Sequence, residues 1–221
     1  MKNLQSKHPL AIRWFHWVNF PVLALMVWSG LKIYRAYDVY RIGFGSWTLL
    51  RIDKEFLSHL GITQGLAVGM AWHFLFGWIF AVNGALYVGY LVVSGAWRHI
   101  LPNRSSLKEA WQVVLHDLRI RKEPLPKAKF NGAQKIAYTG VVLLGFIALA
   151  SGLAIYKPVQ LAFLLFVFGG YQGARFVHFW VCMLFVLFFV VHIVQVTRAG
   201  WNNFRSMITG REIVIGEQPN V

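Results

Sequence analysis

The sequence has 221 residues, of which 57% are hydrophobic, 16% are aromatic and only 14% are charged. This composition and the positive mean hydropathy exclude an ordinary soluble domain and indicate a membrane protein. A formal net charge of +14 would suit a nucleic-acid-binding protein, but the basic residues lie between and beside apolar segments and form no recognition motif. The single cysteine, Cys182, excludes an internal disulfide, a cysteine-based zinc or iron–sulfur site and a C-x-x-C-H haem attachment.

Four apolar segments are long enough to cross a bilayer, which takes about 20 residues. They lie at 12–34, 65–97, 134–156 and 174–197. We therefore predict an all-α integral membrane protein in which residues 1–221 form one domain, a bundle of four transmembrane helices. A fifth apolar run, 161–168, is too short to span and is flanked by helix-breaking residues, which favours a position at the membrane interface.

The distribution of lysine and arginine predicts the orientation in the membrane. The connection from Arg98 to Lys135 holds nine of them and the two tails hold three each, against five in the 32–54 connection and two in the 157–175 connection. Because cytoplasmic loops carry the excess of positive charge, both termini and the long connection are predicted to be cytoplasmic.

The long connection contains its own helical pattern. In the segment SSLKEAWQVVLHDLRIRK, residues 105–122, apolar residues recur at helical spacing, which predicts a cytoplasmic amphipathic helix lying on the membrane. Pro124 and Pro126 are expected to end this helix before the third span.

Four of the eight histidines lie inside the predicted spans, where an ionisable side chain is costly and indicates a functional site. They are His16, His73, His178 and His192. In the fourth span, His178 and His192 are roughly 21 Å apart along the helix axis. Their directions around the axis differ by only about 40°, so they share one face of the helix. In a hydrocarbon core about 30 Å thick, one imidazole then lies near each side. Depth pairs His16 with His192 at the inner level and His73 with His178 at the outer level.

Two opposed imidazoles within a helix bundle suit a six-coordinate haem b that transfers electrons, whereas each histidine taken alone also suits an interhelical hydrogen bond. Arg13 and Arg175 precede His16 and His178 by three residues and share their helical faces. These arginines are candidate contacts for haem propionates, with lipid-headgroup anchoring as the alternative. Ion transport is disfavoured, because all eight acidic residues lie outside the predicted spans.

Several short motifs follow one another in the same order as in a known family. They are His16-Trp17 and Ser29-Gly30 in the first span, HFLFG at 73–77, FNGAQK at 130–135, SGLAIYKP at 151–158 and the H-x13-H of the fourth span. In this order they resemble the bacterial di-haem cytochrome b family, which includes the gamma subunit of membrane formate dehydrogenase and the cytochrome b subunits of nickel–iron hydrogenase and thiosulfate reductase. The resemblance covers nearly the whole chain.

The resemblance implies that the four histidines are the axial iron ligands of two haems b in a multi-pass protein of the bacterial inner membrane. It also implies electron transfer between a periplasmic oxidoreductase, by preference a molybdopterin-dependent one, and the quinone pool. In formate dehydrogenase-like members, quinone binds beside the inner haem near the start of the third span, and Asn131 and Gln134 occupy the matching places. Asn131 also suits a helix N-cap. The chain departs from that pattern in its longer connection, 35–62, which faces the periplasm in the predicted topology.

Two other functional classes fit the sequence. One is a stand-alone di-haem cytochrome b that oxidises superoxide at the outer surface and reduces quinone, and the other is a haem-free membrane scaffold or transporter. A reduced-minus-oxidised spectrum separates the scaffold from the cytochromes, and co-purification of a periplasmic subunit separates the two kinds of cytochrome.

Overall fold

The computed structural model describes residues 2–37, 41–44, 46–117, 119–120 and 130–215. The chain forms two compact units, of which the first contains residues 1–85 and 186–221 and the second contains residues 86–185. Each unit is described by itself below. The prediction that residues 1–221 form one domain stays a prediction.

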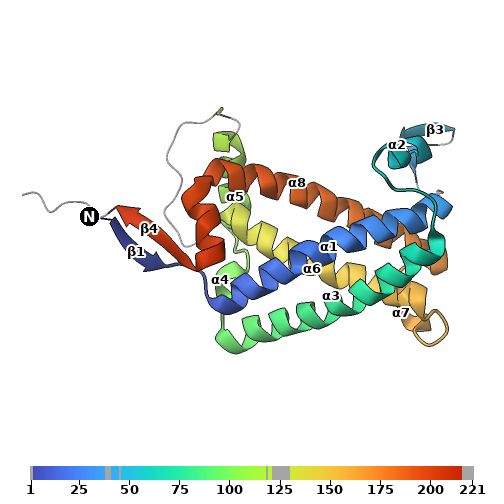
Figure 1. Cartoon of the computed structure of the whole chain (residues 1–221), viewed down its shortest axis with the longest axis horizontal. Coiled ribbons are helices and arrows are strands. Elements are labelled where there is room, and N and C mark those ends of the chain that lie inside the picture. The colour runs from blue at the N-terminus through green and yellow to red at the C-terminus, as the bar shows by residue number, and fades with distance from the viewer. Residues whose placement is uncertain (1, 38–40, 45, 118, 121–129, 216–221) are drawn as a thin grey trace, which may run out of the picture. The chain divides into compact units, whose positions relative to one another are not determined.

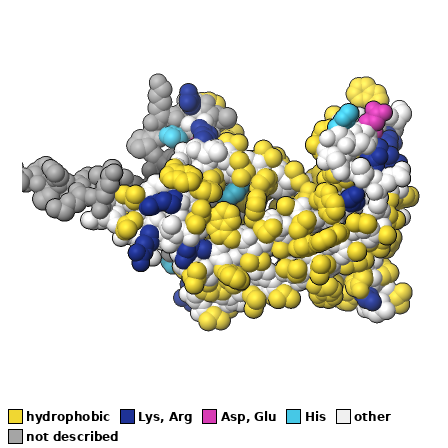
Figure 2. All heavy atoms as spheres, viewed as in Figure 1, with side chains coloured by type: hydrophobic (Ala, Val, Ile, Leu, Met, Phe, Trp, Pro, Cys, Tyr) yellow, Lys and Arg dark blue, Asp and Glu magenta, His cyan; other side chains and the backbone are white. Residues whose placement is uncertain are grey.

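Within the described residues, four helices are long and apolar enough to cross a membrane, which confirms the predicted spans. They are α1 (Leu10–Ala36), α3 (Leu66–Ser94), α6 (Gly132–Tyr156) and α8 (Tyr171–Thr209) (Figure 1). Large apolar side chains such as Trp72, Leu75 and Trp78 of α3 are exposed, and hydrophobic side chains cover the visible face of α1 and α3 (Figure 2). Such a surface requires lipid around it, so the chain is an all-α, multi-pass membrane protein.

The fourth span ends at a break in α8. Gly200 has φ 82° and ψ 172°, a conformation that glycine adopts without the steric cost that a side chain imposes. The helix before Gly200 corresponds to the predicted span 174–197, and the helix after it is a short segment that ends at Thr209. Figure 1 shows this last part of α8 turning away from the main axis.

In the first unit, α1 and α3 are joined by hydrogen bonds within the apolar region. Asn83 Nδ2 on α3 donates to Asn19 Oδ1 on α1 at 2.9 Å, and Asn83 is buried. Hydrogen bonds of this kind satisfy polar side chains that lipid cannot solvate, and they fix one helix against another.

The tails of the first unit form a small sheet that the sequence did not lead us to expect. Strand β1 (Lys2–Ser6) pairs antiparallel with β4 (Arg211–Ile215). Lys7 Nζ, just beyond β1, donates to Glu212 Oε2 at 2.6 Å. The pairing therefore ties the start of α1 to the end of α8.

The connection between α1 and α3 is also structured. Strands β2 (Ile42–Phe44) and β3 (Trp47–Leu50) form an antiparallel hairpin, followed by α2 (Lys54–His59). Arg35 NH1, at the end of α1, donates to the Lys54 carbonyl at 2.6 Å and to Ser58 Oγ at 2.7 Å. These two bonds hold α2 against the end of the first span.

In the second unit, α6 packs against α4 (Trp97–Ile100), α5 (Ser106–Asp117) and α7 (Ala162–Val167). Helix α5 is the predicted amphipathic helix; Pro124 and Pro126, expected to end it, lie outside the described residues. A Cβ atom at Gly132 would collide with the Ser106 carbonyl, so α5 approaches the start of α6 closely. Helix α7 has six residues and is too short to span a bilayer, as predicted for this run.

Candidate functional site

His73, on α3, is held by a serine of the neighbouring helix in the first unit. Its Nδ1 lies 3.0 Å from Ser29 Oγ on α1, and Ser29 is fully buried. The Ser29 hydroxyl also lies 2.6 Å from the Leu25 carbonyl in the preceding turn. Donation to that carbonyl favours the arrangement in which the serine oxygen accepts from the imidazole and Nδ1 carries the hydrogen. A Cβ atom at the next residue, Gly30, would lie 3.4 Å from His73 Cε1, which shows that the imidazole lies directly against α1.

His178, on α8, has matching surroundings in the second unit. Its Nδ1 lies 3.0 Å from Ser151 Oγ and 3.0 Å from the Ala148 carbonyl, both on α6. The Ser151 hydroxyl also donates to the Ile147 carbonyl at 2.7 Å, and Ser151 is fully buried. A Cβ atom at Gly152 would lie 3.1 Å from His178 Cε1. Each of these two histidines thus contacts a Ser-Gly pair on a neighbouring helix.

These contacts fix which imidazole nitrogen is able to bind a metal. A backbone carbonyl only accepts, so the Ala148 contact requires a hydrogen on His178 Nδ1, and the back-bonded Ser29 favours the same tautomer for His73. In a neutral imidazole the other nitrogen, Nε2, then carries the lone pair. A hydrogen bond from the outer nitrogen is the usual means by which proteins orient a metal-binding histidine and increase its basicity.

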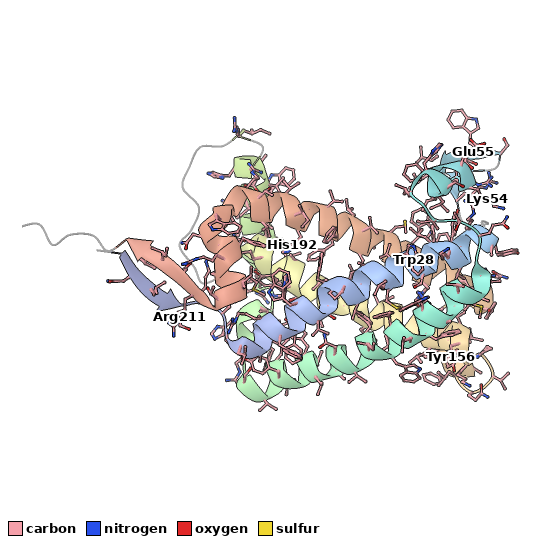
Figure 3. All side chains as sticks on the ribbon, in the orientation of Figure 1. Trp28, Lys54, Glu55, Tyr156, His192 and Arg211 are labelled. Carbon is pink, nitrogen blue, oxygen red and sulfur yellow. The ribbon has the colours of Figure 1, made fainter. Side chains whose placement is uncertain are left out.

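His16 and His192 lie together in the first unit, on α1 and α8, and Figure 3 labels His192. Their ring centres are 6.0 Å apart and their planes make an angle of 57°. His192 also stacks on Phe188, one turn earlier, at 5.9 Å and 10°. Nδ1 of His16 is buried and has no hydrogen-bond partner in the described part of the chain. The structure therefore brings together the predicted inner pair; the pairing of His73 with His178 stays a prediction.

The two candidate arginines differ in their contacts. Arg13 NH1 donates to the Ile208 carbonyl at 2.5 Å, and Trp17 Nε1 donates to the neighbouring Met207 carbonyl at 3.1 Å. These bonds attach the start of α1 to the last part of α8, while Arg13 Nε is buried without a partner among the described residues. Arg175 lies over the Tyr171 ring, 5.8 Å from its centre. Their predicted role at haem propionates stays a prediction.

Asn131 and Gln134 form a capping box at the start of α6. Asn131 Oδ1 accepts from the Gln134 amide at 2.9 Å, and Gln134 Oε1 accepts from the Asn131 amide at 3.0 Å. Asn131 is therefore the helix N-cap that the sequence allowed. The capping bonds use only the acceptor oxygens, and both side-chain NH₂ groups keep their donors.

Comparison with known proteins identifies the family. Residues 7–210 match the prokaryotic cytochrome b561 family. A relative from Azospira oryzae, named "Putative protein-methionine-sulfoxide reductase subunit YedZ1", is 30% identical over 198 residues, which are 88% of this chain and 92% of the relative. The chain belongs to the prokaryotic cytochrome b561 family. It is a multi-pass cytochrome b of the bacterial inner membrane, which confirms the resemblance to bacterial di-haem cytochromes b, and membership implies b-type haem.

The residues present fit a haem held by two imidazoles. Two imidazoles bound on opposite sides of one metal ion have centres about 6 Å apart, since each metal–nitrogen bond is about 2 Å and each ring adds roughly 1 Å. The His16–His192 separation of 6.0 Å matches this value. No group of three or more His, Cys, Asp or Glu residues that would hold a bare metal ion exists among the described residues. The donor set therefore suits an iron whose equatorial ligands come from a porphyrin.

Sequence reasoning missed the serines and one lysine. Ser29-Gly30 and Ser151-Gly152 stood out as motifs, but spacing along one helix does not show which side chain of another helix a serine meets. Lys32 stands in the overlap of the predicted span 12–34 and the 32–54 connection and was counted only for its charge; it lies in α1 and is only 7% exposed. A charged residue just before the end of an apolar segment was the signal that could have identified it.

Proposed function

We propose that this protein transfers electrons across the inner membrane, between a periplasmic oxidoreductase and the quinone pool, through two b-type haems. His16 and His192 hold the inner haem, and His73 and His178 hold the outer one. Both termini and α5 lie on the cytoplasmic side in this proposal, and the 35–62 connection lies on the periplasmic side.

The observation that carries the proposal is that His73 and His178 have the same kind of hydrogen-bond partner at Nδ1. Each has a buried serine oxygen of another helix 3.0 Å from its Nδ1, which favours the tautomer with the lone pair on Nε2. An interhelical hydrogen bond alone would explain one such contact. Two histidines with the same Ser-Gly contact support metal ligation.

The residues of the chain supply position and electrostatics. Histidine nitrogens from two helices would hold each haem, and a haem held in this way would suit electron transfer rather than substrate binding. When bound, haem b supplies one-electron redox chemistry, and the protein sets its potential through the ligands and their surroundings. The apolar faces of the spans keep water from the imidazoles.

The quinone site is proposed at the start of α6, where Asn131 and Gln134 present their NH₂ groups. Their oxygens are occupied by the capping box, so what remains is a pair of donors, which is what a quinone carbonyl requires. A double substitution to alanine would remove the donors and the cap together, so it would not separate the two roles.

A cap-preserving pair of substitutions separates them. Asn131→Ser with Gln134→Glu keeps a serine N-cap and an acceptor at the third helical position, which is the sequence of a capping box, but removes both NH₂ groups. We expect normal haem content and folding with re-oxidation by added quinone slowed about tenfold, equivalent to roughly 1.4 kcal/mol. Re-oxidation at the wild-type rate in a haem-loaded double variant would eliminate this quinone site.

The periplasmic partner is proposed from the relative's name. The relative is named "Putative protein-methionine-sulfoxide reductase subunit YedZ1", so we propose a periplasmic reductase of this kind; that it depends on molybdopterin stays a prediction. Membranes containing the chain and its partner should re-oxidise their reduced b-type α band when a peptide containing methionine sulfoxide is added. An α band that stays reduced under these conditions, in membranes with an intact periplasmic fraction, would contradict this partner.

A further inference from the structure

Lys32 is a buried cation within the first span. Its side chain is only 7% exposed, its Nζ donates to the Thr63 carbonyl at 3.1 Å, and Nζ lies 5.2 Å from the centre of the Trp28 ring. A neutral carbonyl and an aromatic face attract an ammonium group but do not neutralise it. No carboxylate forms an ion pair with Lys32 among the described residues. A buried ammonium is costly unless an anion accompanies it.

The surroundings of Lys32 place it beside a proposed iron ligand. Lys32 follows Ser29 by three residues, so the two share a face of α1 and are about 4.5 Å apart along the helix axis. Across from them is Gly69, one turn before His73 on α3. A Cβ atom on Gly69 would lie 2.9 Å from Lys32 Cβ and 3.2 Å from the Ser29 carbonyl. The absence of a side chain at Gly69 therefore lets α3 approach α1 at Ser29 and Lys32, and His73 contacts the same Ser29.

The lysine side chain extends toward the outer end of α3. Its Nζ lies 3.4 Å from the Cβ position of Gly65 and 3.1 Å from the Thr63 oxygen, both before α3 begins at Leu66. The amine thus lies beyond His73 in the direction of the end of α1 at Ala36. Figure 3 labels Trp28 on the same part of α1.

We propose that Lys32 binds a propionate carboxylate of the haem held by His73. This inference rests on the proposed haem ligation and adds an anion site to it. A haem is apolar except for two carboxylates at one edge, so in a membrane that edge turns toward the nearest surface and requires a cation where the dielectric constant is low. Lys32 has the required charge, depth and burial. A phosphate of a lipid headgroup has similar chemistry, but it would have to reach an amine that is covered by α1, α3 and the chain before α3.

The charge has a consequence for the haem that a purely structural lysine would not have. A positive charge near the iron favours the reduced state, because reduction adds an electron to the haem. Removing the charge of Lys32 should therefore lower the midpoint potential of the haem held by His73, which is identified as the haem that His73→Ala loses. The potential of the other haem should stay unchanged.

Two variants separate charge from packing. Lys32→Met removes the charge and keeps the length of the side chain, and Lys32→Gln also removes the charge but keeps an NH₂ donor for Thr63. We expect both variants to retain two haems and to shift the reduction equilibrium of the His73-level haem at least tenfold toward the oxidised form, equivalent to about 59 mV for one electron. Lys32→Arg should stay within about threefold of the wild type, since the positive charge remains.

Lys157→Met is the matched control. Lys157 lies just past the end of α6, its Nζ is 4.8 Å from the Tyr156 ring centre, and it is exposed, so its removal should leave both potentials unchanged. The measurement is a spectroelectrochemical titration of the purified protein in nanodiscs of zwitterionic lipid, repeated with added anionic lipid. If Lys32 bound a lipid phosphate, the wild-type potential would depend on anionic lipid, and the proposal would be wrong.

The potentials and the haem content of the Lys32 variants also support or overturn the proposal. Wild-type potentials in haem-loaded Lys32→Met and Lys32→Gln would overturn the proposal and leave Lys32 a structural residue that bonds Thr63. If both neutral variants lose the outer haem while Lys32→Arg keeps it, the charge requirement is supported. An absence of haem from the wild-type protein would instead refute the proposed function itself.

Discussion

Replacing Ser151 or Ser29 with alanine tests whether these hydroxyl groups set the tautomer of the proposed iron-binding histidines. Both serines are fully buried, and the Oγ atom of each lies 3.0 Å from a histidine Nδ1. Alanine is smaller by one oxygen atom, so the substitution removes an acceptor and leaves the backbone of α1 or α6 intact. The helix carbonyls that the hydroxyls also contact keep their own backbone hydrogen bonds.

The expected magnitude follows from the loss of a buried hydrogen-bond partner. Leaving a buried N–H without an acceptor costs about 1–3 kcal/mol, and losing the partner of a metal-binding histidine lowers metal affinity about 10–100-fold. His178 keeps the Ala148 carbonyl at 3.0 Å, so Ser151→Ala should lie near the lower limit of this range. The loss of the hydrogen bond also makes the imidazole less basic, which raises the midpoint potential of the haem it holds.

The assay is haem retention together with potentiometry. Transfer of haem from the purified variant to excess apomyoglobin gives a dissociation rate, and a redox titration gives the potential of each haem. Both Ser29→Ala and Ser151→Ala should accelerate the loss of the same outer haem and raise its potential, because His73 and His178 are proposed to hold it together. Ser94→Ala is the matched control: Ser94 Oγ donates to the Tyr90 carbonyl at 2.6 Å one turn back, as Ser29 and Ser151 do in their helices, but has no histidine partner.

Two results would refute this reasoning. If both serine variants retained haem at the wild-type rate with unchanged potentials, the hydroxyls would not act on iron ligands. If the two variants affected different haems, the tautomer argument would survive, but the pairing of His73 with His178 would be wrong.

The other predictions concern haem content, the inner pair and the tails. A pyridine haemochrome assay should find close to two haems per chain, and one or none would exclude the di-haem proposal. His16→Ala and His192→Ala should each remove the same inner haem and spare the outer one, as measured by redox titration. Burial, with the charge of Lys7 second, lowers the pKa of His8 below its usual 6.5, so the unfolded chain binds a proton more readily than the folded chain. The contribution of His8 to stability should therefore be full above about pH 6.5 and be lost as pH drops through the lowered pKa. Thermal unfolding of the wild type between about pH 7.5 and 5 should show this decrease. The same decrease in His8→Gln would contradict its assignment to His8.

The long spans and the amphipathic helix were predictable because one physical signal dominates each of them. A run of about 20 apolar residues has few alternatives to a spanning helix, and the apolar stripe of α5 follows directly from helical spacing. The depth of each histidine in its predicted span also predicted that His16 and His192 lie together, because both are a few residues from the cytoplasmic end of a span. Their ring centres are 6.0 Å apart.

Other features could not be predicted because they depend on contacts between segments far apart in sequence. The β1–β4 sheet pairs Ser6 with Arg211, and neither tail has a strong strand pattern by itself. Gly200 was one glycine among 20, and nothing local showed that it would break α8. For Asn131 the sequence allowed both a cap and a quinone contact; the cap is now seen, and the contact stays a prediction.

In our proposals the serines and Lys32 act on the same outer haem with opposite signs, which gives a final prediction. The hydroxyls strengthen the imidazoles as donors and stabilise the oxidised state, whereas the lysine charge stabilises the reduced state. Ser29→Ala should therefore raise the outer potential, and Lys32→Met should lower it. Hydrogen bonding at Nδ1 and charge at a propionate are separate mechanisms, although Ser29 and Lys32 are one turn apart in α1. In Ser29→Ala/Lys32→Met the two shifts should partly offset each other, apart from the coupling of about 0.5–3 kcal/mol that neighbouring residues show. If both single variants instead shifted the potential in the same direction, a common disturbance of the α1–α3 packing at Gly69 would explain them better, and the separate roles assigned to the two residues would have to be abandoned.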